Sequence, residues 1–156
     1  WSVIPLLDER LFVVGQGSLP GMPQGRRVRL GQLGAVPLIL PSHSHGLRAI
    51  VDSAFARTKC EPHIVLEIDG LAALMDAVRA GLGATVQPGA AMVRVPNEQV
   101  AMVEIADKGA YRRNLLASLS DDELSPAALA ARVVLADVAR TLVRAGRWPG
   151  ATLHEN

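Results

Sequence analysis

A short apolar strand that leads directly into a helix is the feature that most constrains the fold of this chain. The predicted strand covers residues 37–40, a polar Ser-His-Ser-His turn occupies 42–45, and the predicted helix runs over about 45–58. The apolar residues of this helix recur at helical spacing, which marks one buried face. They are Leu47, Ile50, Val51, Ala54 and Phe55. We expect Ser44 to be the N-cap, because its hydroxyl can accept a hydrogen bond from a free amide of the first turn.

Two further segments continue this alternation of strand and helix. Residues 63–68 predict a strand, and apolar residues at helical spacing predict a helix over about 70–80 that ends at Gly81. Residues 84–87 predict the next strand. An order of strand, helix, strand, helix, strand favours a parallel-dominated sheet with right-handed crossovers. The predicted fold class is therefore α/β.

Strands, turns and one long helix are predicted on either side of this region. The Gly- and Pro-rich residues 15–34 predict a surface excursion with a short helical turn near 30–33, and 88–92 predict a turn or short helix. Ser125, as an N-cap followed by a proline, begins a long helix that ends near residue 146. The remaining predicted strands cover residues 10–14, 99–105 and 112–118.

The size and composition of the chain narrow its function classes. Its 156 residues suffice for one domain with a core or two small subdomains. A formal net charge of +1 and 3% aromatic residues give neither the field nor the stacking surface that nucleic acid needs, and no apolar run reaches the roughly 18 residues that span a membrane. Cys60 is the only cysteine, which excludes an internal disulfide and indicates a reducing compartment. Because the chain begins at Trp1, we expect it to be a piece of a longer protein.

The turn at residues 42–45 has the character of an anion-binding cup. Free backbone amides at the carboxyl end of a strand are flanked there by the side chains of Ser42, His43, Ser44 and His45. No general base, nucleophile or metal set accompanies this turn in the sequence. We therefore expect it to bind a small molecule rather than to transform one, with no enzymatic activity and no cofactor.

Three other chemistries are weaker alternatives. His43 and His45 stand two residues apart and could share a metal, but a third ligand would have to come from elsewhere. Glu67 and Asp69 could form an acid–base pair at a strand end, although Asp69 is placed to cap the next helix. Residues 15–17, Gly-Gln-Gly, follow a strand as a dinucleotide loop does, but the third glycine and the following helix are missing.

Four stretches of the chain carry a resemblance to a known family. They are Pro5-Leu-Leu-Asp-Glu-Arg-Leu11, Pro37-Leu-Ile-Leu-Pro-Ser42 with Gly46-Leu-Arg48, Val78-Arg-Ala-Gly-Leu-Gly-Ala-Thr-Val-Gln-Pro88, and Ser125-Pro-Ala-Ala128. In this order and spacing, they resemble the effector-binding domain of LysR-type bacterial transcriptional regulators. The segment His45-Gly-Leu-Arg48 and the ending Gly146-Arg-Trp-Pro-Gly150 are similar to members related to nitrogen-assimilation control.

The resemblance implies a periplasmic-binding-protein-like fold of type II, with two Rossmann-like subdomains joined by two crossing strands. Residues 17–111 would form the second subdomain, and residues 1–16 and 112–156 would belong to the first. The winged helix-turn-helix, the linker helix and the opening part of the first subdomain, with its Ser/Thr loop, are missing from this sequence.

The effector site of the family corresponds to the turn from Ser42 to Leu47 in this sequence. The resemblance adds cleft candidates at the end of the predicted strand 84–87 and near the second crossing strand. The candidate effector-binding residues are Ser42, His43, Ser44, His45, Leu47, Thr85, Pro88 and Arg112. We expect the effector to be a small organic or inorganic anion, because of the helix that starts at this turn.

The resemblance also implies the partners of the protein. A homodimer or tetramer would form, with the helix at about 45–58 as one contact surface and with Arg48, Arg57 and Lys59 on or near it. DNA would be bound only through the missing helix-turn-helix domain. The protein would act in the cytoplasm, without a membrane.

Two other function classes stay open beside the regulator. A solute-binding protein of the periplasm shares the architecture, while residues 78–88 and 125–128 favour the regulator. A Rossmann-type oxidoreductase is disfavoured by the incomplete glycine motif. A longer sequence would separate the three through a helix-turn-helix, a signal peptide or a complete Gly-x-Gly-x-x-Gly motif.

Overall fold

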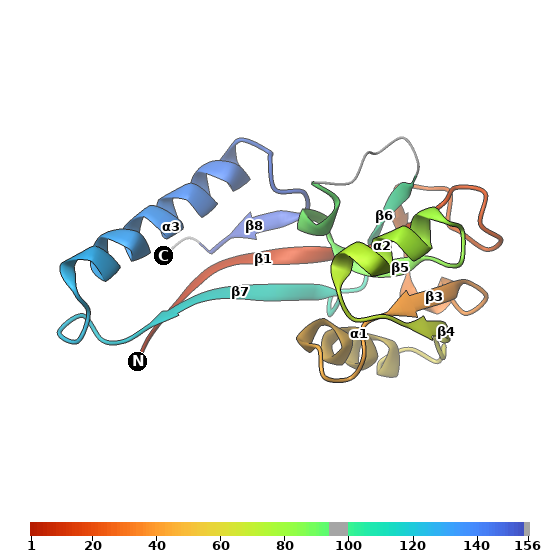
Figure 1. Ribbon diagram of the computed structural model, residues 1–156. Coiled ribbons are helices and arrows are strands. Elements are labelled where there is room, and N and C mark those ends of the chain that lie inside the picture. Colours follow the sequence, from red (N-terminus) through yellow and green to blue (C-terminus); the bar gives the residue numbers. More distant parts are fainter. Residues whose placement is uncertain (94–99, 155–156) are drawn as a thin grey trace. The chain divides into compact units, whose positions relative to one another are not determined.

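Two units make up the part of the chain that the structure describes. This computed structural model describes residues 1–93 and 100–154. One unit comprises Trp1–Glu9 and Arg113–Asn156, and the other comprises Arg10–Arg112. The strands β1 (Ser2–Gly15) and β7 (Tyr111–Ser118) run from one unit into the other (Figure 1). The expected assignment of residues to two family subdomains stays a prediction.

The second half of β1 is the central strand of the larger unit. It pairs antiparallel with β5 (Thr85–Pro88) on one side and with β6 (Ala101–Ile105) on the other. Val13 lies opposite Val86 in the first pair and opposite Val103 in the second. The short strand β2 (Arg27–Val28) runs parallel to β6. The apolar run that predicted a strand at 10–14 is thus buried between two neighbours.

The predicted parallel arrangement is present around β3 (Pro37–Leu40). It pairs parallel with β4 (His63–Glu67), and a parallel bridge joins Leu38 to Ala84, just before β5. The carboxyl ends of β3, β4 and β5 therefore point to one edge, since parallel strands share their direction. The antiparallel pairing of β1 makes the sheet mixed rather than purely parallel.

Helices α1 (Gly46–Ala56) and α2 (Leu71–Arg79) cover opposite faces of the sheet. Leu38 and Leu40 belong to the core cluster that contains the buried face of α1, whereas Ile39 belongs to the cluster that contains α2. Alternation along a strand explains this division, because successive side chains point to opposite faces. Figure 1 shows α2 above β3 and α1 below it.

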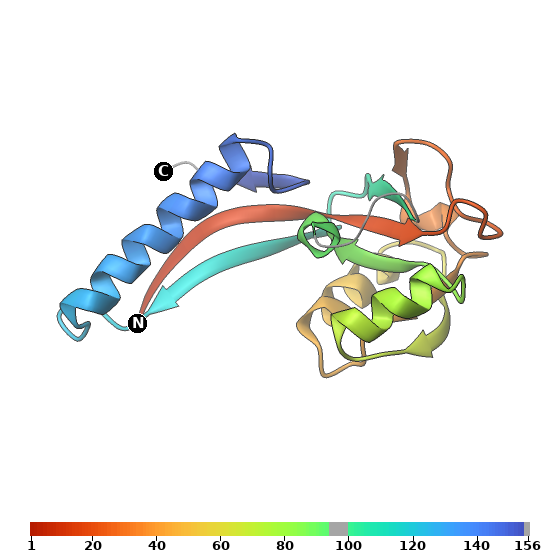
Figure 2. The same ribbon diagram turned by 45° about the horizontal axis from the view of Figure 1, so that its top comes forward.

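The smaller unit contains the first half of β1, β7, α3 (Pro126–Arg144) and β8 (Ala151–Leu153). Strand β8 pairs antiparallel with β1, and α3 packs beside β8 (Figure 2). The predicted start of α3 is confirmed, because the Ser125 side chain accepts a hydrogen bond from the Ala128 amide and Pro126 is the first helical residue. Within the described residues, no helix has the length and apolarity to cross a bilayer.

The two short helical turns predicted from the sequence are confirmed as 3₁₀ helices, η1 (Leu30–Gln32) and η2 (Gly89–Met92). The prediction for β1 was too short, since the strand begins at Ser2 rather than at residue 10. The start of the strand predicted at 99–105 lies outside the described residues at position 99, and β6 begins at Ala101.

Candidate functional site

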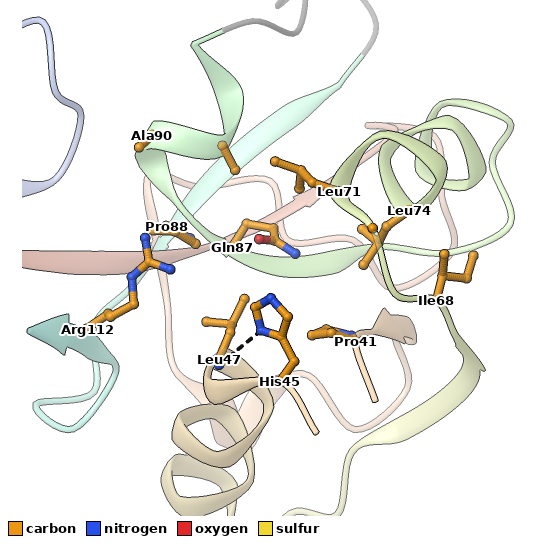
Figure 3. A pocket seen from close by; sticks show the side chains of 12 residues that line it. Pro41, His45, Leu47, Ile68, Leu71, Leu74, Gln87, Pro88, Ala90 and Arg112 are labelled. Atoms are coloured by element: carbon orange, nitrogen blue, oxygen red, sulfur yellow. Dashed lines mark hydrogen bonds between the residues drawn. The ribbon is translucent and has the colours of Figure 1, made fainter. Parts of the chain in front are cut away.

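A pocket of about 310 Å³ lies within the larger unit (Figure 3). Its described lining is mostly apolar, with three polar side chains. The lining residues are Pro41, His45, Leu47, Ile68, Gly70, Leu71, Leu74, Gln87, Pro88, Ala90, Ala91 and Arg112. The volume falls at the lower end of the range for small-molecule sites, which suits a compact ligand.

The pocket forms where strands β3, β4 and β5 end. Each strand leads into a helix that begins at the pocket: α1 after β3, α2 after β4 and η2 after β5. Crevices at the carboxyl ends of strands are the usual place for ligands in open α/β sheets. The alternation of strand and helix in the sequence therefore determines where this pocket lies.

His45 caps α1 at the pocket wall. Its backbone is extended, and its Nδ1 accepts a hydrogen bond from the Leu47 amide at 3.2 Å. The expectation that Ser44 is the N-cap is wrong, because the turn closed by His45 N–H to Ser42 O places the helix start one residue later. With Nδ1 engaged as the acceptor, Nε2 is the ring nitrogen left to donate to a ligand.

The N-terminus of α2 faces the same space. Gly70 and Leu71 line the pocket, and α2 begins at Leu71 with Gly70 as its N-cap and no side-chain cap among the described residues. Gly70 has a φ of +94°, a backbone conformation that residues with a Cβ atom rarely adopt. The expectation that Asp69 caps α2 is wrong, because this carboxylate bonds to Ser42 instead. The starts of α1 and α2 both carry partial positive charge, which favours an anion between them.

Strand β5 contributes Gln87 and Pro88 to the lining. Figure 3 shows the Gln87 side chain in the middle of the pocket, between His45 and Leu71. The amide is only 5% exposed, and its Nε2 donates to Thr85 Oγ1 at 3.3 Å. Thr85 is fully buried, is not among the described lining residues and holds Gln87 through this bond. A polar side chain among buried apolar residues was the sequence signal for Gln87, and it was overlooked.

Arg112 supplies the permanent positive charge among the described lining residues. Figure 3 places its guanidinium beside Pro88, at the side of the pocket opposite Leu74 and Ile68. No aspartate or glutamate is among the described residues of the lining. The Arg112 guanidinium is a group that can bond an anion bidentately, and Leu71 with Leu74 gives the lining an apolar side.

Ser42 and Ser44 lie outside the described lining; their hydroxyls bond to each other, and Ser42 also bonds to Asp69. The Ser42 backbone amide donates to Asp69 Oδ1 at 2.9 Å, and its hydroxyl donates to Asp69 Oδ2 at 2.7 Å. The two serine hydroxyls are 2.8 Å apart. These bonds from the backbone and side chain of Ser42 lower the pKa of Asp69, helped by the nearby His45 and only partly opposed by desolvation.

His43 is not among the described lining residues and belongs to a polar network around Arg48. Its Nε2 lies 3.3 Å from Arg48 Nη2, and its Nδ1 lies 3.4 Å from Asp52. The two imidazoles of the turn therefore have different partners. Among the described residues, no group of three His, Cys, Asp or Glu side chains comes together in a way that would hold a metal ion.

Arg48 is buried, so the expectation that it lies on a contact surface of the helix is wrong. Its side chain is 6% exposed and bonds to Asp52, Glu67 and the Pro41 carbonyl. Burial alone would lower the pKa of Arg48, but the hydrogen bonds and charges of Asp52 and Glu67 outweigh it and raise that pKa. Glu67 is thereby engaged in an ion pair rather than in an acid–base pair with Asp69.

The predicted site residues thus fall into two groups. His45, Leu47, Pro88 and Arg112 line the pocket, whereas Ser42, His43, Ser44 and Thr85 are not among its described lining. Gly70, Leu71 and Gln87 line it and were not predicted. A nucleophile with a neighbouring base is not found in the described lining, so the arrangement can bind and orient a ligand by hydrogen bonds, charge and apolar contact.

Comparison of sequences identifies the family. The family model described as "LysR substrate binding domain" matches residues 1–140. The chain is 36% identical over 87 residues to the nitrogen assimilation regulatory protein nac of Klebsiella aerogenes, covering 56% of this chain and 27% of that protein. The predicted similarity to nitrogen-assimilation regulators is confirmed. The chain spans about a quarter of the length of this relative.

Solved structures confirm the fold class. The CcmR regulatory domain of Synechocystis PCC6803 in complex with 2-PG aligns with a TM-score of 0.77 at 21% identity, covering 89% of this chain and 67% of that one. The effector binding domain of QuiR in complex with shikimate aligns with a TM-score of 0.74 at 24% identity, covering 90% and 66%. At these identities, the likeness concerns the fold, which is the predicted periplasmic-binding-protein-like fold.

Proposed function

Because this chain belongs to the LysR substrate binding domain family, we propose that it is the effector-sensing part of a transcriptional regulator and binds a small anion in the pocket described above. The observation that carries the proposal is the convergence of the starts of α1 and α2 and of Arg112 on one pocket. Transcriptional control by the whole protein, through a DNA-binding domain outside this chain, is part of the proposal.

The pocket suits a compact organic anion with one apolar face. The guanidinium of Arg112 would hold a carboxylate or phosphate, since bidentate bonds to such groups are among its strongest. The His45 Nε2–H and the Gln87 amide would bond polar groups in the middle of the ligand, and Leu71 with Leu74 would contact its apolar part. Each charge-assisted bond contributes about 1.5–3 kcal/mol, which corresponds to roughly ten- to a hundredfold in affinity.

Ligand binding would regulate by changing populations of conformations. A ligand shifts an equilibrium only as far as its affinities for the two states differ. In this proposal the bound anion stabilises one arrangement of the protein and thereby changes how the DNA-binding domains of a homodimer or tetramer are presented. The protein acts in the cytoplasm and binds its effector without turning it over.

A titration with charged and neutral versions of the same ligand tests the proposal. The full-length protein is titrated by calorimetry with shikimate, 2-PG, benzoate and inorganic phosphate, and with the methyl esters of shikimate and benzoate. We expect at least one anion to bind, and the ester of a binding carboxylate to bind at least about tenfold more weakly. Equal affinity for acid and ester, or no binding by any probe, would contradict the proposal of an anion site.

A further inference from the structure

We propose that Asp69 is a positioning residue for the effector pocket, which acts by holding Ser42 and never touches the ligand. This inference rests on the proposed function. Two hydrogen bonds carry it: the Ser42 amide donates to one carboxylate oxygen at 2.9 Å, and the Ser42 hydroxyl donates to the other at 2.7 Å. Both oxygens of one side chain are thus committed to one residue that lies 27 positions away.

The Ser42–Asp69 bonds join the two turns that precede α1 and α2. The parallel pairing of β3 with β4 reaches Leu40 opposite Glu67, and the Ile68 amide then donates to the Leu40 carbonyl at 3.0 Å. Both strands end beyond that bond. The next hydrogen bonds between the two segments are those of Ser42 with Asp69. The Arg48 side chain also connects this region, through the Pro41 carbonyl and Glu67, but Ser42–Asp69 is the pair that joins the two turns directly.

The immediate neighbours of both residues line the pocket. Pro41 precedes Ser42, and Ile68 and Gly70 flank Asp69. The Ser42 carbonyl also accepts the His45 amide at 3.0 Å, which fixes the residue that caps α1. Neither Ser42 nor Asp69 is among the described lining residues. The pair therefore controls the spacing of His45 and Gly70 across the pocket from outside it.

The charge of Asp69 and its role in holding Ser42 predict opposite effects on anion affinity when the side chain is removed. The carboxylate lies close enough to His45 to interact with it electrostatically, so a negative charge is held near the proposed anion site. If charge were its main effect, removing it would strengthen the binding of an anion. If position is its main effect, removing the side chain weakens binding, because a small misplacement of binding groups costs much of their contribution.

Two substitutions at Asp69 separate these effects. Asp69→Ala removes both charge and bonds, whereas Asp69→Asn removes the charge but keeps an acceptor for the Ser42 amide and a donor for its hydroxyl. Asp76→Ala is the control, because Asp76 is an exposed acid of α2 that pairs only with Arg79 among the described residues and lies outside the pocket lining. Affinity is measured by calorimetry on the full-length protein, with the tightest binder among shikimate, 2-PG, benzoate and inorganic phosphate as the probe.

We expect Asp69→Ala to weaken binding about tenfold, and Asp69→Asn and Asp76→Ala to bind as the wild type does or more tightly. Amide exchange in the ligand-free protein should quicken at residues 42–47 and 68–74 in Asp69→Ala and stay near wild type in Asp69→Asn. Unchanged or tighter binding by Asp69→Ala, whatever its stability, would overturn the positioning role while leaving the proposed function intact. Failure of the wild type to bind any probe would overturn the proposed function, and the positioning role with it.

Discussion

The guanidinium Nη1 of Arg48 donates to the Glu67 carboxylate at 2.8 Å and ties helix α1 to strand β4. The same nitrogen donates to the Pro41 carbonyl at 3.0 Å, and Nε donates to Asp52 at 2.9 Å. The arginine is buried, whereas its two acidic partners remain partly exposed. A buried cation therefore lies beside the turn that forms one wall of the pocket, and its partners Asp52, Pro41 and Glu67 all belong to the larger unit.

Replacing Arg48 should destabilise this unit. Arg48→Met keeps the aliphatic stem but leaves the buried Pro41 carbonyl without its donor and the two carboxylates without their counter-ion. We expect a loss of about 1–3 kcal/mol in the free energy of unfolding, measured by urea denaturation. Arg140→Met removes an exposed pair with Asp137 and should cost less than about 1 kcal/mol. Equal costs for the two variants would show that the Arg48 network contributes little.

Trp148 should contribute to the stability of the smaller unit through Glu9. The indole Nε1 donates to Glu9 Oε1 at 2.6 Å, and Asn114 donates to the other oxygen at 2.7 Å. Because Glu9 is fully buried, Trp148→Phe takes a donor from a carboxylate that water does not reach, at a cost of about 1.5–3 kcal/mol. Trp1→Phe is the matched control, since Trp1 is 87% exposed. Thermal or urea unfolding that gives the same stability for both variants would contradict this assignment.

The Ser42–Asp69 bonds should make the stability of the folded protein depend on pH in the acidic range. The hydrogen bonds from Ser42 lower the pKa of Asp69 in the folded protein below its unfolded value, so its contribution is present above about pH 4 and is lost as the pH falls through the folded pKa. The wild type should therefore melt above Asp69→Asn at pH 7, and the difference should shrink as the pH is lowered from about 5 to 3. A difference in melting temperature that stays constant over this range would contradict the linkage.

Self-association should involve the exposed side of α1. The proposed regulator is a homodimer or tetramer, and Ser53 lies on the exposed face of α1, while Arg48 is withdrawn into the protein. The full-length protein should sediment as a dimer or larger at micromolar concentration, and Ser53→Arg should raise its dissociation constant about tenfold or more, while Asp76→Arg on exposed α2 should not. A stable monomer in the wild type would refute the proposed assembly.

Local periodicity explains which elements could be predicted. Helices α1, α2 and α3 and strand β4 each carry enough apolar residues at regular spacing to be identified within a few residues. Strands β2 and β8 were missed because two or three residues hold no period, and they exist only by pairing with β6 and β1. The first half of β1 depends in the same way on partners that are distant in sequence.

Side chains of the site that depend on partners distant in sequence could not be predicted either. His45 and Arg112 were predicted because a turn and a family resemblance placed them, and the structure brings both to one pocket. The bonds that connect Ser42 to Asp69 span 27 positions, so no local pattern distinguishes Asp69 from a helix cap. A shift of one position along a polar turn decides which side chain caps the helix and lines the pocket. The sequence predicted the cap at Ser44, whereas the structure has it at His45.

The most direct test of the central claim is the affinity of an Arg112 variant for the probe anion, measured by calorimetry on the full-length protein. Arg113→Gln is the matched control, since Arg113 is the next residue, pairs with Asp8 and is not among the described lining residues. We predict that Arg112→Gln weakens binding of the anion by roughly ten- to a hundredfold and that Arg113→Gln leaves it within about twofold. Equal affinities of Arg112→Gln and the wild type would contradict the account and place the anion outside this pocket.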